Sequence, residues 1–142
     1  MSSRTMFLLS ATIVLSALFA LSQKQEVKHV PAPYTPPTSG QEMYVAYCAS
    51  CHGKEGKGDG PAASALKTPV TDLTALAKQN NGKFPSLHVS EVISGEHTAN
   101  VHGSREMPVW GNVFLSMHGH DSRWVQMRVS NLTRYIESLQ AK

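Results

Sequence analysis

Both cysteines of the chain lie within one five-residue segment, Cys48-Ala49-Ser50-Cys51-His52. Two thiols three positions apart, followed directly by a histidine, form the attachment pattern of covalent c-type haem. The thiols add to the two vinyl groups along one edge of the porphyrin, and the next residue then lies under the ring with its imidazole directed at the iron. The segment therefore predicts Cys48 and Cys51 as thioether anchors and His52 as the proximal axial ligand.

Three other kinds of site use the same residue types. A thioredoxin-like redox pair follows a strand of a βαβ unit, whereas residues 40–47 (GQEMYVAY) are typical of a short helix. A zinc site needs four ligands, and His118 and His120 would have to complete it from far along the chain. A disulfide between the two cysteines would close only a very small loop and leave the histidine unexplained. Haem attachment accounts for all three residues of the motif, and the other sites stay open as alternatives.

The N-terminal segment has the pattern of an export signal. Arg4 precedes an apolar run over residues 6–21 (MFLLSATIVLSALFAL), as the n-region and h-region of a signal peptide do. The run is somewhat short for a membrane span, which takes about 20 apolar residues, and this favours cleavage, although the residues around Ala20 form an imperfect cleavage site. We therefore predict residues 1–22 to be an export signal or an uncleaved N-terminal membrane anchor.

Prolines dominate the segment that follows. Residues 23–38 contain four of them, at positions 31, 33, 36 and 37, and this density favours extended polyproline II, a semi-rigid spacer of about 3.1 Å per residue. We predict a proline-rich linker over residues 23–38 and one folded domain over residues 39–142. The alternative is a mature N-terminus that is disordered and has no role.

The charge balance favours no particular class of macromolecular partner. Lys and Arg number 13 against 10 acidic residues, and two haem propionates would offset most of this excess. We therefore expect no nucleic-acid binding, and only a local patch of charge could steer a partner.

The clearest predicted helix follows Asp121. Apolar residues recur there at spacings of four and three, which places them on one helical face, and Asp121 or Ser122 can cap the first turn. These apolar residues are Val125, Val129, Leu132, Ile136 and Leu139. Shorter helices are predicted over residues 70–79 and 86–94, and no segment alternates with the period of a strand. The sequence therefore predicts an all-α domain of three to five helices, with long loops wrapped around one covalent haem that fills its middle.

Residues 40–139 resemble class I cytochrome c, the family of small mono-haem electron carriers. Gly40 and Tyr44, eight and four residues before the first cysteine, are similar to the glycine and aromatic residue of that family's N-terminal helix. Leu132 and Tyr135 are similar to their partners on its C-terminal helix. The resemblance implies the cytochrome c fold, in which these two helices cross.

Two proline motifs extend the resemblance. Gly60-Pro61 is similar to the family segment in which the proline carbonyl accepts the second N–H of the proximal histidine. Met107-Pro108 matches the motif that supplies the sixth ligand of the iron. Pro108 also disfavours a helical conformation at Met107, so the thioether can project from a loop. We predict Met107 as the distal ligand, with Met117, a loop residue in this interpretation, as the next candidate.

Other side chains near Met107 in the sequence could also contact the haem or its iron. His97, His102, His118 and His120 lie in the flanking loops, so a bis-histidine haem is the alternative ligation. Arg105 and Trp110 carry N–H donors suited to the haem propionates, and Trp110 could equally pack at the rim. The chain departs from short members of that family in the loop over residues 118–123, which is longer.

The predicted function is one-electron transfer by one covalent haem c with His52 and Met107 as axial ligands. We expect redox partner proteins, such as a reductase, an oxidase or a dehydrogenase, and a periplasmic location, either soluble or tethered to the inner membrane. The alternative is a haem enzyme or gas sensor with an open sixth coordination site.

Overall fold

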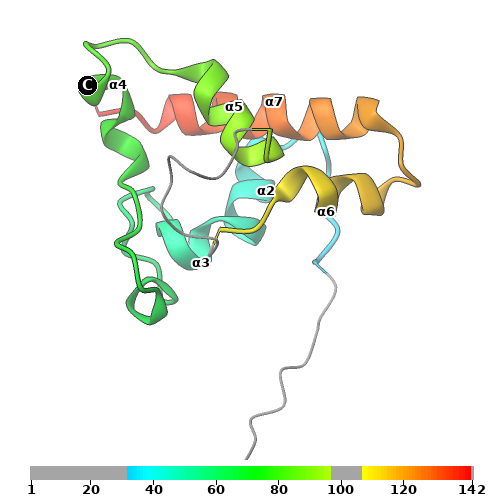
Figure 1. Ribbon diagram of the computed structural model, residues 1–142, viewed down its shortest axis with the longest axis horizontal. Helices are drawn as coiled ribbons and strands as arrows, with labels where there is room; N and C mark the ends of the chain where they lie inside the picture. Colours follow the sequence, from blue (N-terminus) through cyan, green and yellow to red (C-terminus); the bar gives the residue numbers. More distant parts are fainter. Residues whose placement is uncertain (1–31, 97–106, 142) are drawn as a thin grey trace, which may run out of the picture. The chain divides into compact units, whose positions relative to one another are not determined.

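The computed structural model of the protein describes residues 32–96 and 107–141, and residues 32–142 form one compact unit. Across the described residues it has six α-helices, two 3-10 helices and no strand (Figure 1). The helices are α2 (Gly40–Tyr47), α3 (Ala49–His52), η1 (Ala63–Ala65), η2 (Leu73–Ala75), α4 (Leu76–Gln79), α5 (Ser86–Ser94), α6 (Trp110–Met117) and α7 (Ser122–Ser138). The all-α prediction is confirmed. Six helices exceed the predicted three to five because α3 and α4 are single turns of four residues.

The helix ends follow the capping residues in the sequence. The Ser39 hydroxyl accepts a hydrogen bond from the Glu42 amide at the start of α2, and the Asp121 carboxylate accepts one from the Arg123 amide at the start of α7. Such caps satisfy amides that have no partner within the helix. Helix α5 coincides with the predicted helix over residues 86–94, whereas the one predicted over residues 70–79 begins only with η2 and continues as α4.

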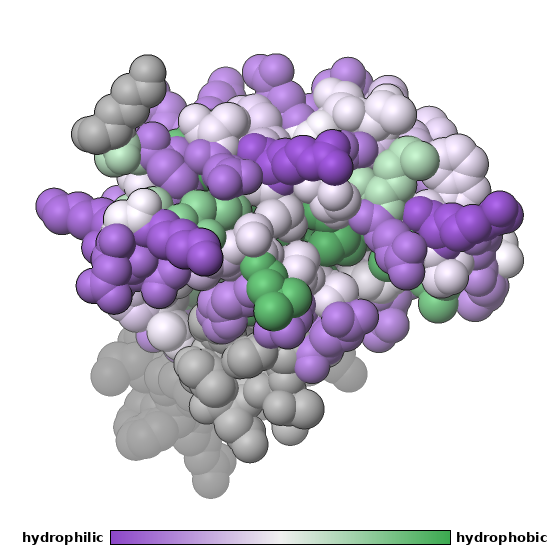
Figure 2. Space-filling model, turned by 90° about the horizontal axis from the view of Figure 1, so that it is seen from above, coloured by the Kyte–Doolittle hydropathy of each residue, from purple (hydrophilic) through white to green (hydrophobic). Residues whose placement is uncertain are grey.

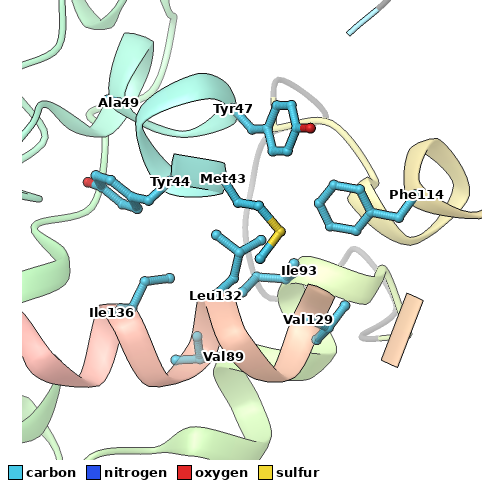
Figure 3. Close-up of a cluster of buried hydrophobic side chains, with 10 residues drawn as sticks. All are labelled: Met43, Tyr44, Tyr47, Ala49, Val89, Ile93, Phe114, Val129, Leu132 and Ile136. Carbon is cyan, nitrogen blue, oxygen red and sulfur yellow. The ribbon is translucent and has the colours of Figure 1, made fainter. Parts of the chain in front are cut away.

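Helix α7 forms the long side of the domain, and α2, α5 and α6 all pack against it. Figure 3 shows Met43 of α2 directed between Leu132 of α7 and Ile93 of α5, with Phe114 of α6 beside them. Full burial of an apolar side chain of this size stabilises the folded state by about 1.5–3 kcal/mol. The whole cluster comprises Met43, Tyr44, Tyr47, Ala49, Val89, Ile93, Phe114, Val129, Leu132 and Ile136.

The crossing of α2 and α7 depends on Gly40. A Cβ atom at this position would clash with the backbone carbonyl of Asn131 and with Cβ of Tyr135. One turn further along α2, the Tyr44 ring lies 5.2 Å from the Tyr135 ring, centroid to centroid. The residues that carried the resemblance on the two terminal helices therefore do meet in the structure.

Helix α6 was not predicted, and Met117 is the last residue of this helix rather than a loop residue. No side chain caps its first turn, and it contains Gly111, which disfavours helix in isolation. The glycine allows close packing, because a Cβ there would clash with the carbonyl of Ser94. Packing, which completely buries Phe114, stabilises the helix in place of local sequence signals.

The described end of the predicted linker packs against the domain. Thr35 and Pro37 are buried, the Tyr47 hydroxyl donates to the Pro33 carbonyl at 2.7 Å, and the Asn131 amide donates to the Pro37 carbonyl at 2.9 Å. The compact unit thus begins at Ala32, seven residues before the predicted boundary. The predicted export signal or anchor and residues 23–31 lie outside the described residues.

Along residues 32–96 and 107–141, no helix combines the length and the apolar character needed to cross a membrane. Seen from the side of α5 and α7, the surface is mostly hydrophilic, with small and separate hydrophobic patches (Figure 2).

Candidate functional site

The two cysteines occupy successive turns at the junction of α2 and α3. Cys48 caps the end of α2 and the start of α3. Its amide donates to the Tyr44 carbonyl, and its own carbonyl accepts from the amides of Cys51 and His52 at 3.2 and 2.9 Å. Residues three apart on a helix lie on the same side of it, so both thiols can reach one edge of a planar group. The local helix therefore turns the sequence spacing into the geometry that two thioether bonds require.

Both thiols are free and partly exposed, so the structure has no disulfide bond between Cys48 and Cys51. Burial, with a smaller contribution from Cys51, raises the pKa of the Cys48 thiol to about 12. A thiol with such a pKa stays protonated at neutral pH, which limits its reaction with oxidants and metal ions.

The surroundings of His52 favour the neutral form of its imidazole. Burial lowers the pKa of its imidazole, and a backbone hydrogen bond partly opposes the shift. That bond joins Nδ1 to the Thr71 carbonyl oxygen at 3.3 Å. A carbonyl oxygen can only accept, so Nδ1 carries the proton in this bond. The lone pair of Nε2 is then available for a metal. The carbonyl next to Nδ1 is thus that of Thr71, whereas the resemblance assigns this role to Pro61. Thr71 has no local sequence signal, because any residue supplies a carbonyl.

The glycine-rich loop after His52 folds back onto α3. The amides of Gly58, Gly60 and Ala62 donate to the carbonyls of His52, Cys51 and Ser50 at 2.8, 3.1 and 2.8 Å. These bonds satisfy carbonyls at the end of a helix that would otherwise lack partners. They also hold Pro61 beside α3, and its predicted hydrogen bond to His52 stays a prediction.

Tyr44 ties α2 to the far end of the motif. Its hydroxyl, on a fully buried side chain, donates to the carbonyl of Gly53 at 2.8 Å. Burial raises the pKa of this hydroxyl far above its usual range, so it stays protonated and keeps donating. The residue directly after His52 is therefore held by a side chain from the preceding helix.

Of the residues predicted on the distal side of the haem, the structure describes Met107 and Trp110. Met107 is 37% exposed and lies at a bend in the short non-helical segment before α6. Arg105, His97 and His102 lie outside the described residues. Trp110 begins α6, and its ring packs 5.0 Å from that of Tyr47; its contact with the haem stays a prediction.

The histidine after α6 has partners of its own. Nε2 of His118 accepts a hydrogen bond from Nε of Arg128 at 3.1 Å, and its ring stacks on Trp124 at 5.0 Å. Within the described parts of the chain, no three or more His, Cys, Asp or Glu side chains gather in an arrangement suited to a metal ion.

The residues around the motif fit a covalent haem. Two free thiols on one side of a helix can form thioethers with a porphyrin edge, and the neutral His52 imidazole is the form that binds iron. Partly buried apolar side chains also pack at the edge of the core, among them Leu73, Leu76 and Phe84.

Comparison with known protein families agrees with this site. Residues 35–121 match the sequence model of the family described as cytochrome C oxidase, cbb3-type, subunit III. This range contains α2 to α6, the Cys48–His52 motif, Gly60-Pro61 and Met107-Pro108. No curated protein and no solved structure matches the chain. Because the match spans more than half of the 142 residues, the protein belongs to this family of cytochrome c domains, whose function is haem-based electron transfer.

Proposed function

We propose that the protein is a one-electron carrier in which His52 and Met107 hold the two axial positions of a single covalent haem. The observation that carries the proposal is the placement of two free thiols and an imidazole within five residues at the junction of α2 and α3, in a chain of the cytochrome c family. The chain has one such motif, which supports one haem.

The chemistry of the two ligands suits electron transfer rather than substrate turnover. The bound haem supplies an iron that changes between the ferric and ferrous states. A thioether sulfur favours the ferrous state and raises the reduction potential. With both axial positions held by the protein, no position is left for a substrate, so the chain acts as a carrier and not as an enzyme.

The family description supports an oxidase as the partner, because it names a subunit of cbb3-type cytochrome c oxidase. We propose that the protein exchanges electrons with such an oxidase, or with a reductase or dehydrogenase of the same chain. Contacts between electron carriers and their partners are small, below about 1,200 Å².

We also propose that the domain works in the periplasm, with the apolar run over residues 6–21 retained as an anchor. The run of uncharged residues after Arg4 supports this location. Cell fractionation and N-terminal sequencing test it. An intact N-terminus in the membrane fraction is expected. A mature chain that begins near Gln23 would leave a soluble carrier, and a cytoplasmic haem protein would contradict the location altogether.

Replacement of the distal ligand tests the axial assignment. In Met107→Ala, we expect loss of the thioether-to-iron absorption band of the oxidised protein, a lower reduction potential and carbon monoxide binding to the reduced protein, which the wild type resists. Each fall of about 59 mV corresponds to a tenfold change in a one-electron equilibrium.

Met117→Ala is the matched control, because Met117 ends α6 and packs against the core. It is expected to keep the wild-type spectrum and potential. Ready binding of carbon monoxide by the wild type, with no effect of Met107→Ala, would contradict the carrier and favour a haem enzyme or gas sensor.

A further inference from the structure

A surface of exposed aromatic and sulfur-containing side chains lies where the chain enters the domain. Tyr34 is 70% exposed, Trp124 is 38% exposed and Met127, one turn further along α7, is 40% exposed. His118 joins them, because its ring lies 6.1 Å from the Tyr34 ring and 5.0 Å from the Trp124 ring. We call these four residues the entry surface.

A buried cation holds the entry surface in place. The guanidinium of Arg128 lies 5.5 Å from the centre of the Tyr34 ring, within the range of a cation–π contact. Its Nε atom donates to His118, and its Nη2 atom donates to the carbonyl of Thr35 at 2.7 Å. The buried Arg128 therefore holds the Tyr34 and His118 rings in a defined position at the surface.

The charges near the entry surface do not oppose a negatively charged surface. The carboxylate of Asp121 accepts hydrogen bonds from Arg123 through both oxygens, at 3.1 Å to Nε and 2.7 Å to Nη2. Lys24 and Lys28 outnumber Glu26 in the preceding segment. Basic residues that follow a membrane anchor in the sequence favour contact with anionic lipids.

The chain also limits how far the entry surface can be from the apolar run. Ten residues, 22–31, separate the end of that run from Ala32, and ten residues span at most about 36 Å when fully extended. Tyr34 follows two positions later. Tyrosine and tryptophan concentrate at the headgroup level of membranes, where one end of the side chain is apolar and the other hydrated.

We propose that the entry surface, formed by Tyr34, His118, Trp124 and Met127, is a membrane-contact surface that rests on the phospholipid headgroups beside the anchor. The proposal rests on the proposed retention of residues 6–21 as an anchor. Figure 1 shows α3 well away from the turn between α6 and α7. Contact through the entry surface would therefore leave the Cys48–His52 motif directed away from the lipid and accessible to a redox partner.

Oxidative labelling of Met127 tests the proposal. The full-length haem-loaded chain is inserted into vesicles of phosphatidylethanolamine and phosphatidylglycerol, sedimented, and labelled with hydroxyl radicals before mass spectrometry. In the wild type, we expect Met127 to react about threefold more slowly in vesicles than in detergent, because lipid covers the interfacial side chains. The double variant Tyr34→Ser/Trp124→Ser should lose this protection. Leu87→Ser, which removes a 72% exposed side chain of α5 outside the entry surface, should keep it.

The other outcomes separate the contact surface from the anchor. A chain that sediments with the vesicles while Met127 reacts as fast as in detergent overturns the entry surface and leaves the anchor standing. If the chain does not sediment with the vesicles, both the proposed anchor and the proposed lipid contact are contradicted. Protection of Met127 only after a cbb3-type oxidase is added would assign the surface to a protein partner and overturn the lipid contact.

Discussion

The guanidinium of Arg128 binds Thr35 across 93 positions of the sequence, with Nη1 3.1 Å from the hydroxyl and Nη2 2.7 Å from the carbonyl oxygen. Arg128 is fully buried, and among the described residues no carboxylate forms an ion pair with it. A buried cation is costly unless its donors are satisfied. Here the hydroxyl, the carbonyl, the His118 imidazole and the faces of two aromatic rings supply that compensation.

Arg128→Ala is expected to lower the free energy of unfolding by about 3 kcal/mol, because it removes charge-assisted hydrogen bonds and takes away the donor to the buried Thr35 carbonyl. Denaturant titration of the haem-loaded protein measures the loss. The control is Arg134→Ala on the exposed side of the same helix, which should change the free energy by less than about 0.5 kcal/mol. Equal losses in the two variants would show that Arg128 does not hold the N-terminal segment.

Gly40→Ala is expected to destabilise the protein by about 1–3 kcal/mol, the usual cost of inserting atoms into a packed contact. The added methyl group would clash with the backbone of Asn131 and push α2 away from α7. The shift of the denaturation midpoint checks this prediction. Val45→Ala, on the exposed side of α2, should leave the midpoint nearly unchanged, and a midpoint of Gly40→Ala equal to that of the wild type would contradict the close crossing.

The cap of α7 predicts a dependence of stability on pH. Hydrogen bonds from the side chain and amide of Arg123 lower the pKa of Asp121. A carboxylate with a lowered folded-state pKa stabilises the fold above its ordinary pKa of about 3.9, and this contribution is lost as the pH falls through the folded-state pKa. Asp121→Asn keeps a capping side chain without the charge. Its Tm should lie below that of the wild type at pH 7, and the difference should shrink in acid. A difference in Tm that does not change with pH would contradict the role of the charge.

Covalent attachment makes the haem resist extraction. We expect acid–acetone treatment to leave the colour on the protein, since thioether bonds survive it. Cys48→Ala and Cys51→Ala should each lower haem loading, as measured by absorbance and intact mass. Ser50→Ala, between the two anchors, is the matched control and should load normally. Complete transfer of the wild-type haem into the solvent would contradict attachment.

The chemistry of the site and the two terminal helices followed from the sequence by itself. The spacing of Cys48, Cys51 and His52 specifies their chemistry within five residues, so no distant contact is needed to recognise it. The apolar repeat after Asp121 likewise predicted α7, with Val129, Leu132 and Ile136 buried as expected. Such signals are local, because capping and helical periodicity act over a few residues.

Only the tertiary structure decided the burial of Arg128, the docking of Thr35 and the formation of α6. Arg128 lies on the same face of α7 as Val125 and Leu132, yet a charged residue is expected at the surface unless a distant group satisfies it. Its partners Tyr34 and Thr35 come from the other end of the chain, within a proline-rich stretch whose composition indicates only an extended conformation. Helix α6 likewise depends on packing against α5 and α7. Contacts between residues far apart in sequence leave no local pattern, and so they become apparent only once the chain has folded.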